Sequence, residues 1–166
     1  GYLAELLGGF INSMIEDMNN FIGLIWSYPL KLLPFKLELM ENVNIDYKFP
    51  FRAADVPEGK DVAFGSSSIV TVVNKAFEVI AMHYLSLPFK VLYLDEFTGS
   101  FDDHHKLAGT RAIEELVSTQ AFSQFFVISH DYSGYNSVSN AEFLVLNPDN
   151  IRLPPQGYNK HLTVYS

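Results

Sequence analysis

Apolar residues recur at helical spacing in two stretches of the chain. Within residues 2–27 they follow one another at intervals of three and four: Leu3, Leu7, Phe10, Met14, Met18, Phe21 and Ile25. This spacing predicts an amphipathic helix, which is either an ordinary core-packing helix or the last turns of a coiled coil that enters a globular head. A second helix is predicted over residues 66–86, where a stripe has the same period: Val70, Val73, Phe77, Ala81 and Tyr84.

A β-hairpin is predicted after the first helix. Its arms are residues 35–40 and 43–51, and it turns at Glu41 and Asn42. Apolar and polar side chains alternate along the second arm, which indicates a strand with one wet face. Residues 52–63 contain proline and glycine and are typical of a loop.

Further strands are predicted in the second half of the chain. Residues 91–94 and 125–128 are continuous apolar runs, typical of parallel strands buried on both faces. Between them Asp102 or Asp103 is expected to cap a helix, and residues 142–146 and 161–165 predict two more strands. This order indicates an α/β fold with a mainly parallel sheet flanked by helices.

Polar residues follow both apolar runs. Asp95 and Glu96 come directly after the first run, and His130 comes soon after the second. A right-handed βαβ unit brings both strand ends to one edge, so we expect these three residues to share a crevice. One of two adjacent carboxylates can hold a metal through water while the other accepts a proton. A lone histidine at a strand end is more often structural, but one beside a carboxylate pair is a better catalytic candidate.

Serines open the second predicted helix. Ser66, Ser67 and Ser68 either cap the helix or bind an anion through their hydroxyls and the free N–H groups at its positive end. The adjacent residues His104 and His105 belong to the following helix, where neighbouring side chains point apart. We therefore expect both imidazoles to be solvated rather than to share a metal.

Composition narrows the class of protein. A length of 166 residues with 48% apolar residues indicates one globular domain, and no apolar run reaches the length of a membrane span. No signal peptide is expected, and the absence of cysteine excludes disulfides and thiolate metal sites and fits a reducing compartment. A net charge of −8 argues against general nucleic-acid binding by this piece alone. The most basic stretch is a solvated face or, alternatively, a phosphate-backbone contact: Lys31, Lys36, Lys48 and Arg52.

Taken in order, these segments resemble the C-terminal lobe of an ABC-type ATPase head of the SMC/SbcC group of DNA repair and recombination ATPases, which includes SbcC-like recombination endonuclease subunits of phages. Residues 91–96 (VLYLDE) are similar to the Walker B motif, residues 97–102 (FTGSFD) to the D-loop and residues 126–131 (FVISHD) to the switch-histidine motif. The resemblance covers the whole chain as a single domain: residues 1–27 as the base of a coiled coil and residues 28–166 as a P-loop NTPase-like lobe.

The resemblance implies a role for each matching residue. Asp95 would hold Mg²⁺ through water, Glu96 would be the general base for the attacking water, and His130 would contact the γ-phosphate of ATP. Ser66, with Ser67 and Ser68, would reach the nucleotide of an opposite head, and Asp102 would act across the same dimer interface. Such positioning and charge stabilisation suit phosphoryl transfer.

The chain departs from the family pattern in two places. The signature loop of the family reads Ser-Gly-Gly followed by Gln or Glu, whereas residues 66–69 read SSSI. No Gly-x-x-x-x-Gly-Lys-Ser/Thr sequence occurs, so the phosphate-cradling loop must come from elsewhere. The resemblance therefore implies half of an ATPase head, which cannot hydrolyse ATP alone.

The same resemblance implies the partners. They are the N-terminal Walker A lobe of the same protein, a second head in a homodimer, a nuclease subunit and DNA, in a cytoplasmic setting and without a membrane. Two alternatives stay open: an SMC- or RecN-like structural DNA clamp, and a degenerate interaction module that no longer hydrolyses ATP. A free-standing metal nuclease that uses Asp95, Glu96, Asp102 and His130 is a poorer alternative, because it leaves the serine-headed helix unexplained.

Overall fold

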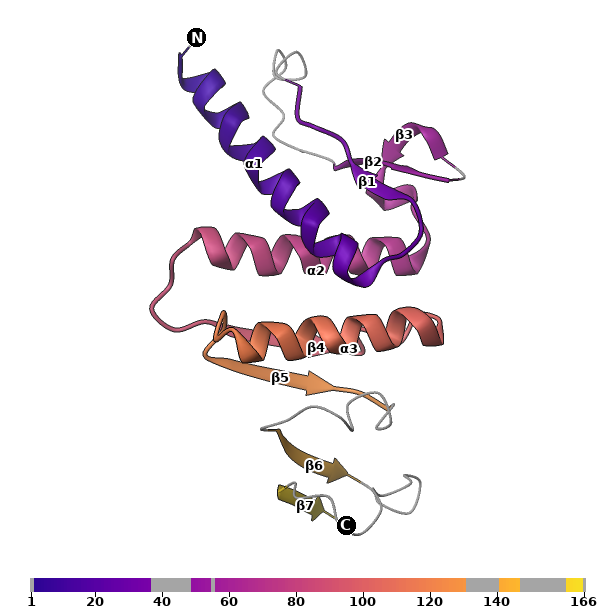
Figure 1. Cartoon of the computed structure of the whole chain (residues 1–166), viewed down its shortest axis with the longest axis vertical. Coiled ribbons are helices and arrows are strands. Elements are labelled where there is room, and N and C mark those ends of the chain that lie inside the picture. The colour runs from indigo at the N-terminus through magenta and orange to yellow at the C-terminus, as the bar shows by residue number, and fades with distance from the viewer. Residues whose placement is uncertain (1, 37–48, 55, 131–140, 147–160, 166) are drawn as a thin grey trace.

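The computed structural model describes residues 2–36, 49–54, 56–130, 141–146 and 161–165. This part of the chain forms helices, a short 3₁₀ turn and strands in the following order (Figure 1): α1 (Tyr2–Ile25), β1 (Leu30–Leu32), β2 (Pro50–Ala53), β3 (Val56–Asp61), η2 (Val62–Phe64), α2 (Ser67–Tyr84), β4 (Val91–Asp95), α3 (Asp103–Ser118), β5 (Gln124–Ile128), β6 (Glu142–Leu146) and β7 (His161–Tyr165).

The helices and the parallel strands lie in stacked layers. α1 crosses α2, and α3 lies in front of β4 in Figure 1. Strands β4 and β5 pair in parallel with Leu92 opposite Phe125, and β6 and β7 form a second parallel pair. The expected α/β class is therefore confirmed. Among the described residues, no ladder joins β5 to β6.

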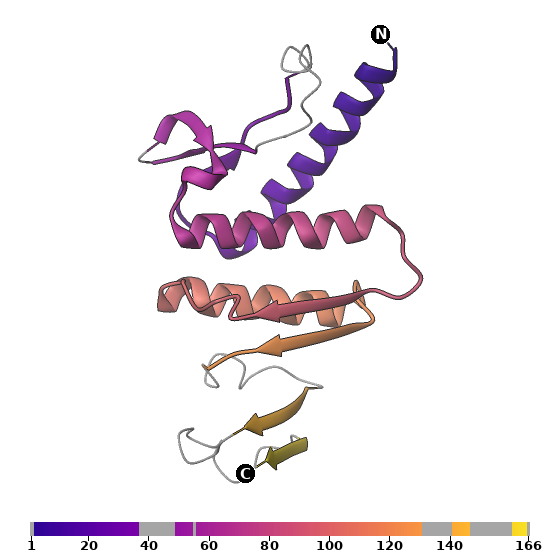
Figure 2. The same cartoon turned by 180° about the vertical axis from the view of Figure 1, so that it is seen from behind.

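One face of the β4–β5 pair carries no helix. Seen from behind in Figure 2, β4 passes in front of α3 with β5 beside it, and no described helix lies in front of either strand. Leu92 and Leu94 are buried, but Tyr93 is 60% exposed. It stacks on Phe126, which is 42% exposed, with ring centroids 5.0 Å apart. The prediction that residues 91–94 and 125–128 are buried on both faces is therefore wrong for this chain, because α3 covers only one side of β4 and most of β5 is exposed.

The antiparallel sheet differs from the predicted hairpin. β2 lies between β1 and β3, with Phe51 opposite Lys60, so the loop predicted for residues 52–63 is wrong. β3 is an edge strand, and edge strands tolerate the proline and the glycine that suggested a loop. Gly59 has φ +80° there, and an added Cβ would lie 2.8 Å from Leu33 Cδ1. Most of the predicted hairpin, residues 37–48 with the turn at Glu41 and Asn42, lies outside the described residues.

The core joins the C-terminal half of α1 to α2, α3, β4 and the strands β1 and β2. Its most completely buried apolar residues include Met18, Ile22, Leu32, Phe51, Val72, Val73 and Leu92. The predicted helix at residues 2–27 is confirmed, but its apolar stripe is buried only from Ile15 onwards. The buried face of α2 centres on Val72, Val73, Ala76 and Val79, so the predicted stripe is partly wrong. Phe77 of that stripe is 44% exposed, because α1 packs over the neighbouring face. No helix in the described part of the chain is long and apolar enough to cross a membrane.

Candidate functional site

A sharp backbone turn places Glu96 at the carboxyl end of the β4–β5 pair. Its N–H donates to the Ile128 carbonyl at 2.9 Å, which extends the parallel ladder by one bond beyond Asp95. Its φ is +46°, a left-handed conformation that costs a non-glycine residue about 1–3 kcal/mol. The chain then turns back, and Gly99 donates its N–H to the Glu96 carbonyl at 2.8 Å. Such local strain is typical of functional sites.

The structure brings Glu96 and His130 together from neighbouring strand ends. The backbone N–H of His130 donates to Glu96 Oε1 at 2.8 Å, and His130 Nε2 lies 3.8 Å from the same oxygen. The His130 side chain is 97% exposed, whereas that of Glu96 is 39% exposed. One carboxylate oxygen is therefore held by the protein, while the imidazole faces solvent. This is the juxtaposition that the order of strands predicts.

Space is kept open beside the other oxygen of Glu96. A Cβ added at Gly99 would lie 3.2 Å from Glu96 Oε2 and 3.1 Å from the Glu96 carbonyl oxygen. Both distances are closer than ordinary van der Waals contact. Glycine at position 99 thus lets the turn approach Glu96 without displacing its carboxylate.

Asp95 has an exposed carboxylate next to Glu96 and His130. It is the last residue of β4 and is exposed, and strand alternation puts it on the face opposite Leu94. Among the described residues, no group of three or more acidic or histidine side chains could hold a metal by itself. Mg²⁺ usually keeps several waters and takes only one or two protein carboxylates together with substrate phosphates. The donor set at Asp95 therefore fits a water-mediated Mg²⁺ and does not fit a protein-only metal site.

The serines of residues 66–68 start α2 and contact the turn after Glu96. Ser66 is the N-cap, and its Oγ accepts from the Ile69 N–H at 3.4 Å, so the expected capping role is confirmed. Ser68 Oγ donates to the Ser100 carbonyl at 2.5 Å. Ile69 lies over Gly65, where an added Cβ would meet its Cγ2 at 2.9 Å. The residues that depart from the family pattern thus have structural contacts of their own.

Asp102 caps α3 and binds a buried histidine. Its Oδ1 accepts from the His105 backbone N–H at 2.9 Å, and its Oδ2 lies 2.8 Å from His105 Nδ1. The backbone hydrogen bond, followed by the imidazole hydrogen bond, holds the pKa of Asp102 below its ordinary value. His104 is exposed as expected, but the prediction of a solvated His105 is wrong, because this side chain is fully buried.

The spacing of Asp102 and His105 is the signal that sequence reasoning missed. An N-cap residue and the residue three positions later face each other in a capping box. Here the later residue is a histidine, which turns back under the cap and packs against Trp26. The backbone N–H of Ser27 donates to Nε2 of the same histidine at 3.3 Å, and no sequence signal could have identified Ser27 as its partner.

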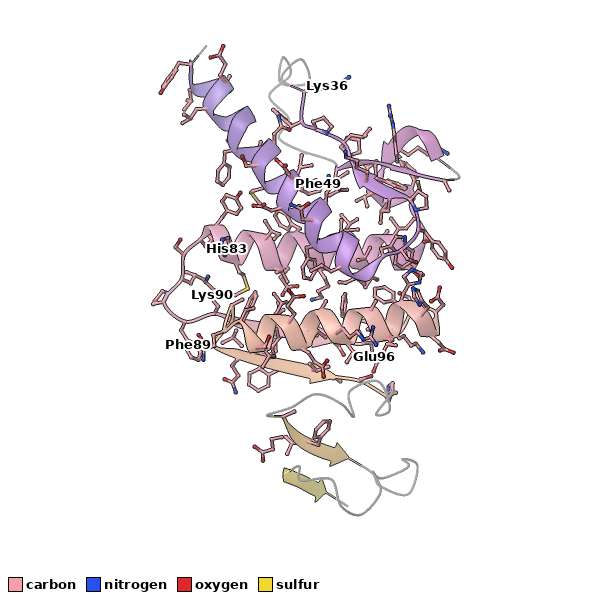
Figure 3. The ribbon with its side chains drawn as sticks, viewed as in Figure 1. Lys36, Phe49, His83, Phe89, Lys90 and Glu96 are labelled. Atoms are coloured by element: carbon pink, nitrogen blue, oxygen red, sulfur yellow. The ribbon has the colours of Figure 1, made fainter. Side chains whose placement is uncertain are left out.

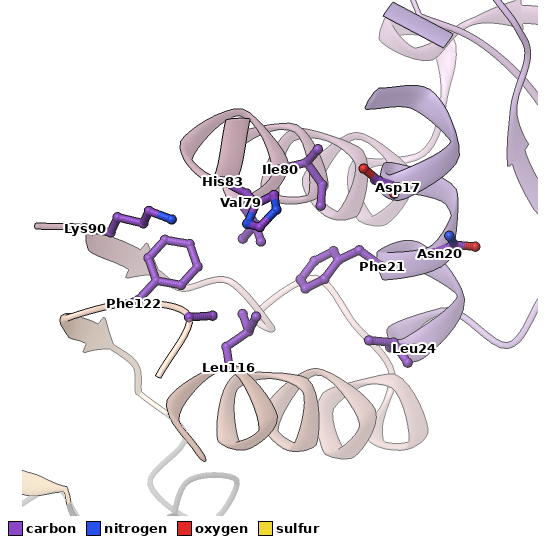
Figure 4. Close-up of a pocket in the computed structure, with 11 residues that line it drawn as sticks. Asp17, Asn20, Phe21, Leu24, Val79, Ile80, His83, Lys90, Leu116 and Phe122 are labelled. Carbon is purple, nitrogen blue, oxygen red and sulfur yellow. The ribbon is translucent and has the colours of Figure 1, made fainter. Parts of the chain in front are cut away.

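A cavity of about 390 Å³ lies between the three helices at the other end of the sheet (Figure 4). Apolar side chains form its walls, with a histidine, a lysine, an aspartate and an asparagine at its margin: Asp17, Asn20, Phe21, Leu24, Val79, Ile80, His83, Lys90, Leu116, Ala121 and Phe122. Figure 3 labels Glu96 near one end of α3 and Lys90 and His83 towards the other. The cavity is therefore separate from the carboxylate site.

Comparison with known proteins gives matches among solved structures alone. No family model matches the chain, and no curated protein matches it. A solved chain described as "Structural biochemistry of ATP-driven dimerization and DNA stimulated activation of SMC ATPases" aligns with a TM-score of 0.58 at 15% identity, over 80% of this chain and 76% of that chain. The SMC head domain from Thermotoga maritima aligns with a TM-score of 0.49 at 18% identity, over 83% of this chain and 44% of that chain. At this low identity the first match shows a shared fold, and the expected fold class, an α/β lobe like that of an ATPase head, is confirmed.

Proposed function

We propose that this chain is the C-terminal half of an SMC/SbcC-type ATPase head, which binds Mg²⁺-ATP and hydrolyses it once a Walker A lobe completes the site. The observation that carries the proposal is the contact between Glu96 and His130 at the carboxyl ends of β4 and β5. In open α/β sheets this edge is where ligands bind. The likeness in fold to an SMC ATPase supports the same class of reaction.

In this proposal each polar residue at the edge has one task. Glu96 takes a proton from the attacking water on Oε2, because Oε1 is already held by the His130 N–H. The exposed imidazole of His130 would contact the γ-phosphate, and Asp95 would hold Mg²⁺ through water. When bound, Mg²⁺ would supply charge neutralisation at the transferred phosphoryl group.

The uncovered sheet supports the need for a second lobe. The described residues leave one edge of β5 and one edge of β6 unpaired, and both strands point the same way in Figure 1. A parallel strand from a Walker A lobe could hydrogen-bond to the free edges of both β5 and β6. A helix of that lobe would then cover the exposed rings of Tyr93 and Phe126. That lobe would also bring the phosphate loop that is missing from residues 1–166.

The first half of α1 supports the interpretation of residues 1–27 as the base of a coiled coil. Its large apolar side chains are exposed although they lie on a helix: Tyr2, Leu3, Leu6, Leu7 and Phe10. A run of exposed apolar residues on a helix is typical of a face that a second helix covers. In this proposal the returning helix of the same protein covers it.

Head dimerisation would use the start of α2 and the D-loop. The Ser66 hydroxyl accepts from the Ile69 N–H and keeps its own proton for a phosphate oxygen of the opposite nucleotide. Ser67 is exposed beside it, and Asp102 is half-exposed. The resemblance to SbcC extends the proposal to a nuclease partner and DNA. Copurification of a nuclease subunit would separate this function from that of an SMC- or RecN-like clamp.

Glu96→Gln tests the proposal in a protein that contains both lobes. We expect the variant to lose ATP hydrolysis but to bind ATP and accumulate as an ATP-bound dimer, because the amide cannot accept the proton from water. Glu115→Gln, at an exposed position on α3, is the matched control. Hydrolysis that persists in Glu96→Gln would contradict the role of Glu96, and robust turnover by residues 1–166 alone would contradict the half-head interpretation.

The altered signature favours one alternative, a degenerate module that does not hydrolyse ATP. Ser68 uses its hydroxyl on the Ser100 carbonyl, and Ile69 fills the position of the family's amide or acid. If this alternative holds, the two-lobe protein shows no turnover and Glu96→Gln changes nothing. A free-standing metal nuclease is disfavoured, because the described residues form no cluster of three metal ligands.

A further inference from the structure

The link between α1 and β1 encloses the side chain of His105. Trp26 stacks on the imidazole with ring centroids 4.2 Å apart, and Tyr28 lies against it at 4.8 Å. His105 is 0% exposed, although it belongs to the first turn of α3. The residues immediately after α1 are therefore packed directly onto the start of α3.

The hydrogen bonds of His105 determine its tautomer. The Ser27 backbone N–H donates to Nε2 at 3.3 Å, and the Ser27 hydroxyl lies 3.1 Å from the same nitrogen. A backbone N–H can only donate, so Nε2 is the acceptor and Nδ1 carries the proton. Nδ1 then donates to Asp102 Oδ2 at 2.8 Å. One imidazole thus joins the end of α1 to the carboxylate of Asp102.

This connectivity is that of a serine-hydrolase triad, but its surroundings exclude that chemistry. A nucleophilic serine needs a histidine whose Nε2 is available to take its proton. Here Nε2 already accepts from the N–H of the same serine, and the imidazole is buried beneath Trp26. The contact is therefore structural rather than nucleophilic.

A second contact continues from Asp102 towards α2. Phe101, the residue before Asp102, packs against Trp26 with ring centroids 5.7 Å apart. On the other side of Phe101, the carbonyl of Ser100 accepts from Ser68 in the first turn of α2. The segment 100–102 thus contacts the residues that follow α1 at one end and the first turn of α2 at the other.

We propose that His105 is a positioning residue that makes the end of α1 and the segment 100–102 move as one unit. It acts through Asp102 and does not itself touch nucleotide. A displacement of α1 then also shifts Asp102 and the start of α2. By thermodynamic reciprocity, nucleotide binding then shifts the preferred position of α1. This inference rests on the proposed function only where it uses ATP turnover as a readout.

Two substitutions separate the two hydrogen bonds of His105. In His105→Asn the amide nitrogen replaces Nδ1, which keeps the bond to Asp102 and loses the bond to Ser27. In His105→Gln the amide oxygen replaces Nε2, which keeps an acceptor for Ser27 and loses the bond to Asp102. His104→Asn, at the exposed neighbouring position, is the control. All variants are made in the full-length two-lobe protein.

Exchange of the Ser27 amide proton tests the link without any use of activity. We expect protection in the wild type and in His105→Gln, and exchange about tenfold faster in His105→Asn, since only that variant lacks the acceptor. Equal exchange in the wild type and His105→Asn would overturn the link. This result is independent of whether the protein hydrolyses ATP.

Turnover then tests the positioning role. We expect His105→Gln and Asp102→Ala each to lower kcat for ATP by about tenfold with KM little changed, and the double variant to be no slower than Asp102→Ala. Additive losses in the double variant would overturn action through Asp102. No turnover in the wild type would instead overturn the proposed function, and the amide-exchange result would still decide the link.

Discussion

The exposed aromatic pair on β4 and β5 provides a quantitative test of the half-head interpretation. Tyr93 and Phe126 stack on the face of the sheet that no described helix covers. If a Walker A lobe docks on this face, replacing both rings by serine should weaken the association of the two lobes. The same change also lowers the stability of the isolated chain, since it removes the stacking contact, about 0.5–1.5 kcal/mol, and the parts of both rings that the chain itself buries.

The magnitude follows from the exposed fractions. An aromatic side chain presents about 200 Å². Tyr93 at 60% exposure and Phe126 at 42% exposure therefore leave about 120 and 85 Å² for a partner to cover. At about 25 cal/mol per Å², the two rings would contribute up to about 5 kcal/mol to association. This corresponds to about 100-fold in Kd for Tyr93 and about 30-fold for Phe126.

The assay uses the two lobes as separate polypeptides and measures their Kd by calorimetry. Tyr93→Ser and Phe126→Ser are compared with Phe64→Ser, which removes a ring that is 77% exposed on η2, away from this face. Chemical unfolding of the chain alone checks that the variants stay folded. An affinity unchanged in both sheet variants, with folding intact, would refute the docking of a lobe on this face.

Three further predictions concern single groups. The pKa of Asp102 is lowered in the folded state. Its contribution to stability is therefore fully present above the ordinary aspartate pKa of about 3.9, and it is lost as the pH falls through the lower folded-state value. Unfolding midpoints measured against pH should show this loss in the wild type and not in Asp102→Asn. The hydrogen bond from the Tyr84 hydroxyl to Asp17 Oδ2 raises the pKa of Tyr84. Its contribution to stability should therefore persist below about pH 10 and disappear as the pH rises through the higher folded-state value. Unfolding midpoints should show a loss of stability in Tyr84→Phe that vanishes at high pH, and a loss that does not change with pH would contradict this. Gly99→Ala should move the Glu96 carboxylate and lower kcat of the two-lobe protein by about tenfold, with ATP binding retained, and normal turnover in Gly99→Ala would show that the space beside Oε2 is not needed.

Periodicity in the chain was a reliable guide to where helices and parallel strands lie. The helix expected at residues 66–86 is α2 (Ser67–Tyr84), and the two apolar runs are β4 and β5. These elements could be predicted because their signals are local: apolar spacing, and a serine or an aspartate at the cap. The meeting of Glu96 and His130 also followed, because parallel strands in a βαβ unit end at one edge.

The errors have a common physical cause, which is that burial depends on neighbours. Residues 56–61 form β3 because β2 offers a free edge, although their composition is that of a loop. Tyr93 is exposed because only one face of β4 is covered, which the apolar run could not indicate. Ser68 donates to the carbonyl of Ser100, a residue 32 positions away, which no local pattern could indicate.

By itself the sequence determined the order of the helices and the parallel strands, the α/β class and the residues that gather at the carboxyl edge of the sheet. These follow from local periodicity and from the handedness of strand crossovers, which act over short distances along the chain. Only the tertiary structure decided that His105 is buried and bonded to Asp102 and to Ser27, 78 residues away. Such a contact depends on how α1 ends against α3, because the packing of distant elements selects the partners of a polar side chain.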